Sequence, residues 1–295
     1  MTLGMILGIL EQGLIYGILA LGLLITYRIL DFPDLTVDSS FPLGAAVSAV
    51  LTLHGMPPAL TLLCALLAGA LAGLVTGLIH VKCKVRDLLS GIITMTGLYS
   101  INLHIAGKAN VPLYAGETLF KNAFTKGLPA WIAPYATVLI VLLVALLAKF
   151  LLDWFLRTKA GFLLRAAGDN PGVVTTLSRD QGTVKILGLV IANALVALSG
   201  AVMCQQQRFF DISMGTGTMV IGLASVIIGT NLFKRVSFMC STTMVIIGSI
   251  IYKACVSIAI SLGLEATDMK LVISVLFLAI LLLSNTRRKK VHIHA

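Results

Sequence analysis

The sequence has few charged residues. Asp, Glu, Lys and Arg together make up 12% of its 295 residues, whereas a soluble globular domain usually carries roughly a quarter. Hydrophobic residues make up 58%, and the mean hydropathy is +1.01. A water-soluble fold has no place to bury so much apolar side chain. The composition therefore excludes a soluble protein and makes lipid the solvent for most of the chain.

Motifs for chemistry are also missing. The sequence has no GxxxxGK[ST] run, so the chain has no phosphate-binding loop of its own. The cysteines show no CxxC spacing and the histidines are scattered, which predicts neither a disulfide framework nor a metal site. No basic segment precedes the first apolar run, so we expect a retained first helix and not a signal peptide. Without a nucleophile, base or metal cluster, we expect a protein that is not an enzyme.

Apolar runs of membrane-spanning length recur along the whole chain. A helix needs about 20 apolar residues to cross a bilayer, and it pairs all its backbone groups internally. We therefore expect an all-α, polytopic membrane protein with about nine spans (eight to ten), forming one domain over residues 1–295. The second and seventh spans are short or polar, which predicts broken or re-entrant helices. The expected spans are 4–30, 36–53, 58–80, 88–107, 130–152, 184–205, 213–230, 236–262 and 268–286.

The net charge of +10 comes from residues in the gaps between apolar runs. We place the C-terminal basic run, Arg287 to Lys290, in the cytosol and alternate backwards through nine spans. About four times as many lysines and arginines then lie inside as outside, as the positive-inside rule requires. This distribution predicts an external N-terminus, and it argues against a nucleic-acid partner.

The expected cytosolic loop, 153–183, is the largest polar stretch. Asn170 followed by Pro171 has the pattern of a helix N-cap and first helical position, which predicts a short helix over 171–180. Its apolar side would hold Val173, Val174 and Leu177. So short a helix is not stable alone in water, so this side needs a partner. Its own helix bundle, the membrane surface and another protein all remain open.

Four stretches of the sequence carry a family resemblance. Gly161 to Pro171, G-x-x-L-R-A-A-G-D-N-P, resembles the cytosolic loop of permeases in the branched-chain amino acid and ribose ABC importer group. Gly13–Leu23, Phe41–Ala46 and Ile221–Gly229 resemble further segments of those permeases, in the same order. The run 31–38 departs from the family pattern, as does Val173-Val174 in place of an alanine pair. The chain thus resembles a side branch that is associated with uptake of aromatic amino acids such as tryptophan.

The resemblance implies a type II ABC importer-like permease in a bacterial cell membrane. Two copies, in contact with membrane lipid, would form the path for an amino acid or a related small polar solute. A solute-binding protein would deliver the solute, and a separate ATPase subunit would hold ATP and Mg, so this chain itself needs no cofactor. The residues expected to couple to the ATPase are Gly161, Arg165, Ala166, Gly168, Asp169, Asn170, Pro171, Val173, Val174 and Leu177.

Polar residues inside the expected spans are candidates for the solute path, because polar groups are costly in a membrane. The candidates are Asp38, Ser39, Thr94, Thr96, Asn102, Asn193, Thr216 and Thr218. Interhelical hydrogen bonding explains the two asparagines equally well. The tract holding Asp31, Asp34 and Asp38 has two interpretations. It is either a solvated turn in which Asp34 or Asp38 caps the second helix, or it forms a cytosolic gate or an ion pair with arginines of the loop.

A stand-alone secondary transporter or channel is the alternative to the permease. Such proteins usually place ionisable residues at mid-membrane or contain inverted repeats. The sequence shows no mid-span carboxylate and no convincing repeat, which favours the permease. Gly69, Gly73 and Gly77 form a small-residue stripe that brings two helices close together, and we expect it to act within one subunit.

Overall fold

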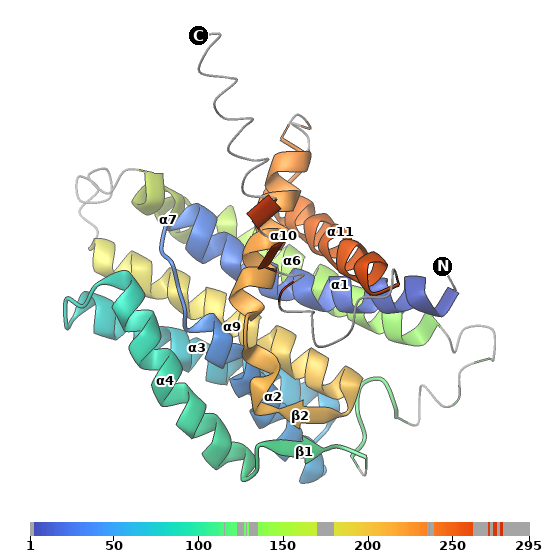
Figure 1. The fold of residues 1–295 in the computed structure, drawn as a ribbon. Helices are drawn as coiled ribbons and strands as arrows, with labels where there is room; N and C mark the ends of the chain where they lie inside the picture. The colour runs from blue at the N-terminus through green and yellow to red at the C-terminus, as the bar shows by residue number, and fades with distance from the viewer. Residues whose placement is uncertain are drawn as a thin grey trace.

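The computed structural model describes residues 3–114, 116–122, 127, 129, 135–169, 180–234, 236 and 239–261, and then only 271, 274, 275, 278 and 279. Within this part the chain is almost entirely helical (Figure 1). The helices are α1 (Leu3–Leu23), its π-helical continuation η1 (Leu24–Ile29), α2 (Val37–Leu53), α3 (Pro58–Val81), α4 (Asp87–Ala106), α6 (Ala136–Leu156), α7 (Lys159–Asp169), α9 (Gln181–Gln207), the 3₁₀ turn η3 (Ile212–Gly215), α10 (Thr218–Leu232) and α11 (Ser241–Ser261). Two short strands, β1 (Asn110–Pro112) and β2 (Phe209–Asp211), pair antiparallel.

The described residues include 7 segments that are long and apolar enough to cross a membrane. These are Leu3–Ile29, Pro58–Val81, Asp87–Ala106, Ala136–Leu156, Gln181–Gln207, Ile212–Leu232 and Ser241–Ser261. The expected second span is the shorter apolar helix α2. The expected ninth span, 268–286, lies almost wholly outside the described residues. The chain is thus a helical, multi-pass membrane protein, and the count of about nine stays a prediction.

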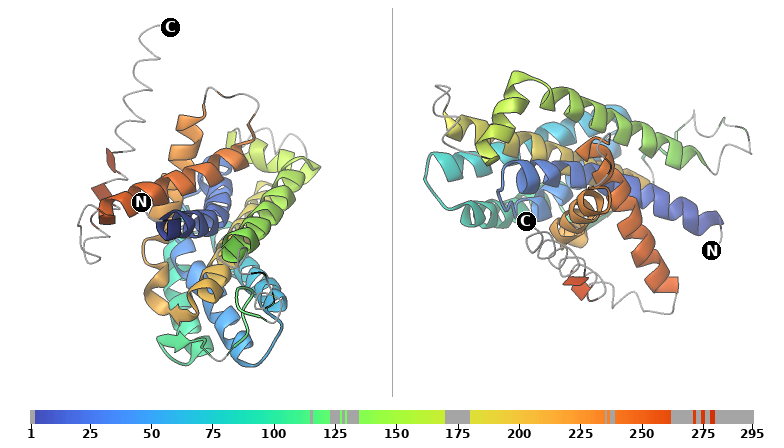
Figure 2. Two further views of the ribbon diagram at one scale, coloured as in Figure 1. Left: turned by 90° about the vertical axis from the view of Figure 1, so that its right-hand side faces the viewer. Right: turned by 90° about the horizontal axis from the view of Figure 1, so that it is seen from above.

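Several of the expected spans have different bounds in the structure, among them the fifth and the seventh. The fifth ends at Leu156 and not at residue 152, because Asp153 is paired with Lys149 one turn earlier and does not stop the helix. The seventh is interrupted, since η3 ends at Gly215 and α10 begins at Thr218. Between them Gly217 has a φ of 83°, a left-handed conformation that suits glycine. Figure 1 and the view from above in Figure 2 show α10 running across the direction of α1 and α6.

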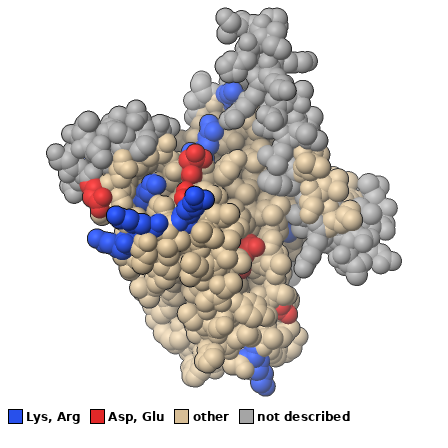
Figure 3. All heavy atoms as spheres, turned by 60° about the vertical axis from the view of Figure 1, so that its left-hand side comes forward, with Lys and Arg blue, Asp and Glu red and all other residues tan. Residues whose placement is uncertain are grey.

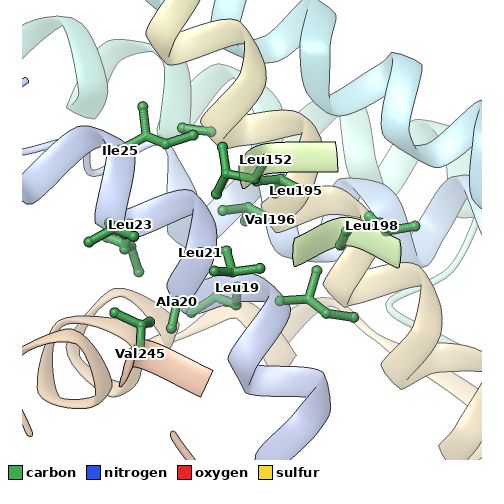
Figure 4. Packing of buried hydrophobic residues seen from close by; sticks show 14 of the residues in the cluster. Leu19, Ala20, Leu21, Leu23, Ile25, Leu152, Leu195, Val196, Leu198 and Val245 are labelled. Carbon is green, nitrogen blue, oxygen red and sulfur yellow. The ribbon is translucent and has the colours of Figure 1, made fainter. Parts of the chain in front are cut away.

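The main hydrophobic core lies where α1, α6, α9 and α11 meet. Leu19 and Leu21 of α1 pack there with Leu152 of α6, Val196 of α9 and Val245 of α11 (Figure 4). Outer helices such as α4 and α6 instead expose leucines and isoleucines, as expected for surfaces that face lipid or another membrane helix.

Glycines allow α2 and α3 to approach α9 closely. A Cβ at Gly44 would overlap the carbonyl oxygen of Ala197, and one at Gly200 would overlap that of Phe41. The stripe expected to pack within one subunit does so, because Gly69, Gly73 and Gly77 lie against Asn193, Leu189 and Ile186 of α9. The tight packing of α2 and α3 against α9 therefore depends on glycine, which has no side chain to separate the helices.

The charged residues support the predicted orientation. Figure 3 turns the left-hand end of Figure 1 forward and shows lysines and arginines gathered there. The ends of η1, α3 and α6 and the start of α7 contribute Arg28, Lys82, Lys84, Arg86, Arg157 and Lys159. These are the helix ends that the sequence predicts to lie in the cytosol. We call this end of the molecule the basic end.

The close approach of α2 and α9 predicts a specific sensitivity to added bulk. Gly44→Ala should destabilise the protein by about 1–3 kcal/mol, because overpacking forces the two backbones apart. Gly97→Ala is the matched control, since a Cβ on this α4 glycine meets nothing within 4 Å. Thermal unfolding of the detergent-solubilised chain measures both. Equal midpoints for the two variants would contradict this packing.

Candidate functional site

A buried polar cluster joins the start of α2 to α9. The Ser40 hydroxyl donates to Asn193 Oδ1 (2.7 Å), and Asn193 Nδ2 donates to Asp34 Oδ2 (2.8 Å) and to the Leu189 carbonyl (3.1 Å). Asp34 Oδ1 accepts the backbone N–H of Thr36 (2.9 Å). These side chains are at most 1% exposed, and within the described part of the chain no cation pairs with Asp34. Asp34 therefore holds a buried turn, in contrast to the solvated turn that the sequence suggested.

Asp38 fixes the start of α10 to the first turn of α2. Its carboxylate accepts the backbone N–H groups of Gly217 (3.2 Å) and Met219 (2.8 Å) and the hydroxyl of Thr218 (3.0 Å). An acidic acceptor is favourable there because the first amides of a helix have no internal partner and carry partial positive charge. Asp38 thus caps a helix, but that helix is α10 and not α2.

Other path candidates connect α2 to α4. Ser39 donates to the Met95 carbonyl (2.8 Å), and Asn102 donates to the Ser39 carbonyl (3.0 Å). Asn102 Oδ1 is buried and has no hydrogen-bond partner among the described residues. Thr94, on the same helix, is buried and donates to the Ser90 carbonyl (3.0 Å).

Two of the eight path candidates are exposed on the surface. Thr96 of α4 and Thr216, between η3 and α10, are both exposed, and η3 packs against α4. The structure thus brings Asp38, Ser39, Asn102, Asn193 and Thr218 together around α2, while Thr96 and Thr216 face outwards.

Sequence reasoning missed an aromatic cluster that holds a lysine. Lys253 Nζ of α11 lies 4.1 Å from the centre of the Tyr16 ring of α1, a cation–π contact. Tyr16 in turn stacks on Phe41 of α2, with ring centres 6.1 Å apart. Residue spacing along a single helix, such as i to i+3 or i+4, cannot reveal the contacts of Lys253, Tyr16 and Phe41, because these residues come from three different helices.

The first half of the expected coupling loop is the helix α7. Gly161 packs against the backbone of Phe155 and Leu156, and Gly168 against the carbonyl of Ile29. Leu164 is fully buried, whereas Arg165 is exposed and Ala166 half-buried. α7 therefore lies against η1 and α6 at the basic end. It ends at Asp169, whose side chain is not described.

The second half of that loop lies outside the described residues. The residues concerned are Asn170, Pro171, Val173, Val174 and Leu177. The helix expected over 171–180 therefore stays a prediction. Asp180 is described and caps α9, where the Gly182 N–H and the Thr183 hydroxyl hold the pKa of its carboxyl below the ordinary value.

Comparisons with known proteins cover nearly the whole chain. Residues 5–284 match a family model described as branched-chain amino acid transport system / permease component. The chain is 44% identical over 280 residues to a protein of Clostridioides difficile (strain R20291) named tyrosine transport system permease protein, covering 95% of this chain and 91% of that one. No solved structure matches the chain.

Two further relatives are more distant. An uncharacterised protein of Rickettsia prowazekii (strain Madrid E) is 32% identical over 285 residues, covering 95% of this chain and 97% of that one. The probable branched-chain amino acid transport permease protein LivH of Methanocaldococcus jannaschii is 28% identical over 229 residues, covering 72% of this chain and 70% of that one.

The capping contact of Asp38 gives a prediction. Asp38→Ala leaves the first amides of α10 without their acceptor and should cost about 0.5–2 kcal/mol of stability. Hydrogen exchange of the amides of Gly217 and Met219 should accelerate in this variant. Asp31→Asn is the control, because Asp31 is exposed and its φ of 52° suits asparagine. Unchanged exchange at α10 in Asp38→Ala would show that the cap does not hold this helix.

Proposed function

Because the chain belongs to the family of permease components of branched-chain amino acid transport systems, we propose that it is the membrane subunit of an ATP-driven importer for an aromatic amino acid. The family resemblance expected from Gly161 to Pro171 is confirmed, and the members of this family are transport subunits. The observation that carries the substrate class is the 44% identity to a permease named for tyrosine transport. That match covers 95% of this chain.

The proposal includes the partners that the sequence predicts. Two copies of the chain form the path in a bacterial cell membrane, and each binds one ATPase subunit that holds ATP and Mg. A solute-binding protein delivers the amino acid from outside. α7 and the residues that follow it, 170–180, are the proposed contact with the ATPase. This assignment is supported by the position of α7 at the basic end, against η1 and α6.

We place the solute path along the surface where α4 meets η3. Thr96 of α4 and Thr216, between η3 and α10, expose hydroxyl-bearing side chains, and α4 also exposes apolar groups such as Ile93 and Ile101. Asp38, Ser39, Thr94, Asn102, Asn193 and Thr218 are hydrogen-bonded inside the subunit. In this proposal they hold the helices that line the path, and a second copy closes it.

The ATPase contact is tested by association and transport. The chain is expressed with its genomic neighbours and extracted in detergent, and we expect an ATPase to copurify. Leu177→Asp should reduce this association at least about tenfold, because a buried charge at a docking helix costs more than 1.4 kcal/mol. Thr175→Asp is the matched control on the opposite side of the predicted helix.

Two results would contradict the ATPase proposal. One is a wild-type chain that brings down no ATPase. The other is uptake of tyrosine by proteoliposomes that contain this chain alone, which would favour a stand-alone transporter. If Leu177→Asp and Thr175→Asp bind the ATPase equally well, the membrane subunit stands but the coupling helix is wrong.

The substrate class is tested on the partner solute-binding protein. Calorimetric titration should show at least about tenfold tighter binding of tyrosine, phenylalanine or tryptophan than of leucine, a difference of about 1.4 kcal/mol. Equal affinity for leucine, or binding of ribose alone, would contradict the aromatic substrate.

A further inference from the structure

Four elements meet at the basic end and leave a cleft between them. η1, the end of α6, α7 and the start of α11 surround a cavity of about 280 Å³. Its lining consists of Leu24, Arg28, Ile29, Leu156, Arg165 and Ser241. Two of the six are arginines, and they come from different helices.

Local structure holds both arginines at this cleft. Arg28 lies in the π-helical turn η1, and single π turns within α-helices are frequent at functional sites. Arg165 lies one turn before Gly168, which packs directly on the carbonyl of Ile29. This contact presses α7 against η1, and it places Arg165 beside the segment that bears Arg28. Both side chains are exposed, and neither forms an ion pair within the part of the chain that the structure describes.

The rest of the cleft also favours an anion. Ser241, which lines the cleft, is the first residue of α11, a helix of 21 residues, and the N-terminus of a helix carries partial positive charge. The carboxylate near this corner is Asp153, which pairs with Lys149 (2.8 Å) and accepts the Thr242 hydroxyl (2.7 Å). Asp31 follows η1 and is exposed, but it makes no ion pair with Arg28. No described carboxylate therefore neutralises the two arginines.

We propose that this cleft binds the phosphate of an anionic phospholipid headgroup from the cytosolic leaflet. A guanidinium group forms paired hydrogen bonds with phosphate oxygens, and basic pockets between membrane helices on the cytoplasmic side suit lipid headgroups. The apolar lining, Leu24, Ile29 and Leu156, fits the glycerol and upper acyl region of a lipid better than a fully hydrated ion. The bound lipid links η1, α7 and α11 at the point from which the proposed ATPase contact continues.

The experiment measures lipid binding to the full-length chain in detergent by native mass spectrometry. Phosphatidylglycerol and phosphatidylcholine are titrated separately. We expect wild type to bind phosphatidylglycerol at least about tenfold more tightly. Arg28→Gln/Arg165→Gln should weaken phosphatidylglycerol binding about thirtyfold, and each single change about fivefold, with phosphatidylcholine unaffected. The lysine pair Arg28→Lys/Arg165→Lys should be intermediate, because it keeps charge but loses the paired hydrogen bonds.

Lys82→Gln/Arg86→Gln is the matched control, since both residues are exposed at the same end but do not line the cleft. Equal losses in this control and in the arginine pair would overturn the proposal in favour of diffuse surface charge. Unchanged binding in Arg28→Gln/Arg165→Gln would also overturn it. Displacement of phosphatidylglycerol by millimolar inorganic phosphate would instead identify a site for free phosphate. Thermal unfolding midpoints within about 2 °C of wild type show that the variants are folded. None of these outcomes depends on which solute the protein transports.

Discussion

The structure depends on one constraint, the need to satisfy polar side chains where no water is present. A buried polar group without a partner costs free energy, and lipid supplies no partner. Four polar side chains of α2 meet this need through neighbouring helices. Asp38 accepts from the start of α10, Ser39 donates to α4, Ser40 donates to α9, and Ser48 accepts from Gln205 of α9. The positions of the surrounding helices are thus linked to the hydrogen bonds that α2 makes.

The same constraint explains where the glycines lie. Side-chain hydrogen bonds of 2.7–2.8 Å join Asn193 of α9 to Ser40 of α2 and to Asp34 in the turn before α2. They require the backbones to come close, and a Cβ at the crossing would prevent it. Gly44 lies one turn after Ser40 and packs on α9, while Gly69 of α3 packs on the carbonyl of Asn193. Polar contacts and small residues therefore act at the same crossings. On its outer face α6 exposes leucines instead.

Local features of the sequence were enough to predict the membrane helices. The spans expected at 58–80 and 88–107 agree with α3 and α4, because an apolar run and its flanking charges fix a span without knowledge of its neighbours. The family was predictable from Gly161 to Pro171 for a similar reason, since the signal is contiguous. The helix predicted over 171–180 lies outside the described residues except for Asp180, so it stays a prediction.

The contacts of Asp34 and Asp38 were not predictable, because their partners lie far along the chain. Asn193 is 159 positions from Asp34, and an aspartate at the end of an apolar run resembles a solvated residue. The sequence did hold a signal that α2 makes polar contacts with other helices. This signal was the run of polar residues at the start of α2, Asp38-Ser39-Ser40, together with an asparagine in the middle of another span. Nothing local marked the π turn that carries Arg28.

A double-mutant cycle on Asp34 and Asn193 tests most directly whether the polar contacts of α2 hold the helices together. The free energy of unfolding in detergent is measured for wild type, Asp34→Leu, Asn193→Leu and the double variant. The account predicts a coupling energy of about 1–3 kcal/mol, because either single change leaves a buried polar partner unsatisfied. Additive effects, with a coupling below about 0.5 kcal/mol, would contradict it.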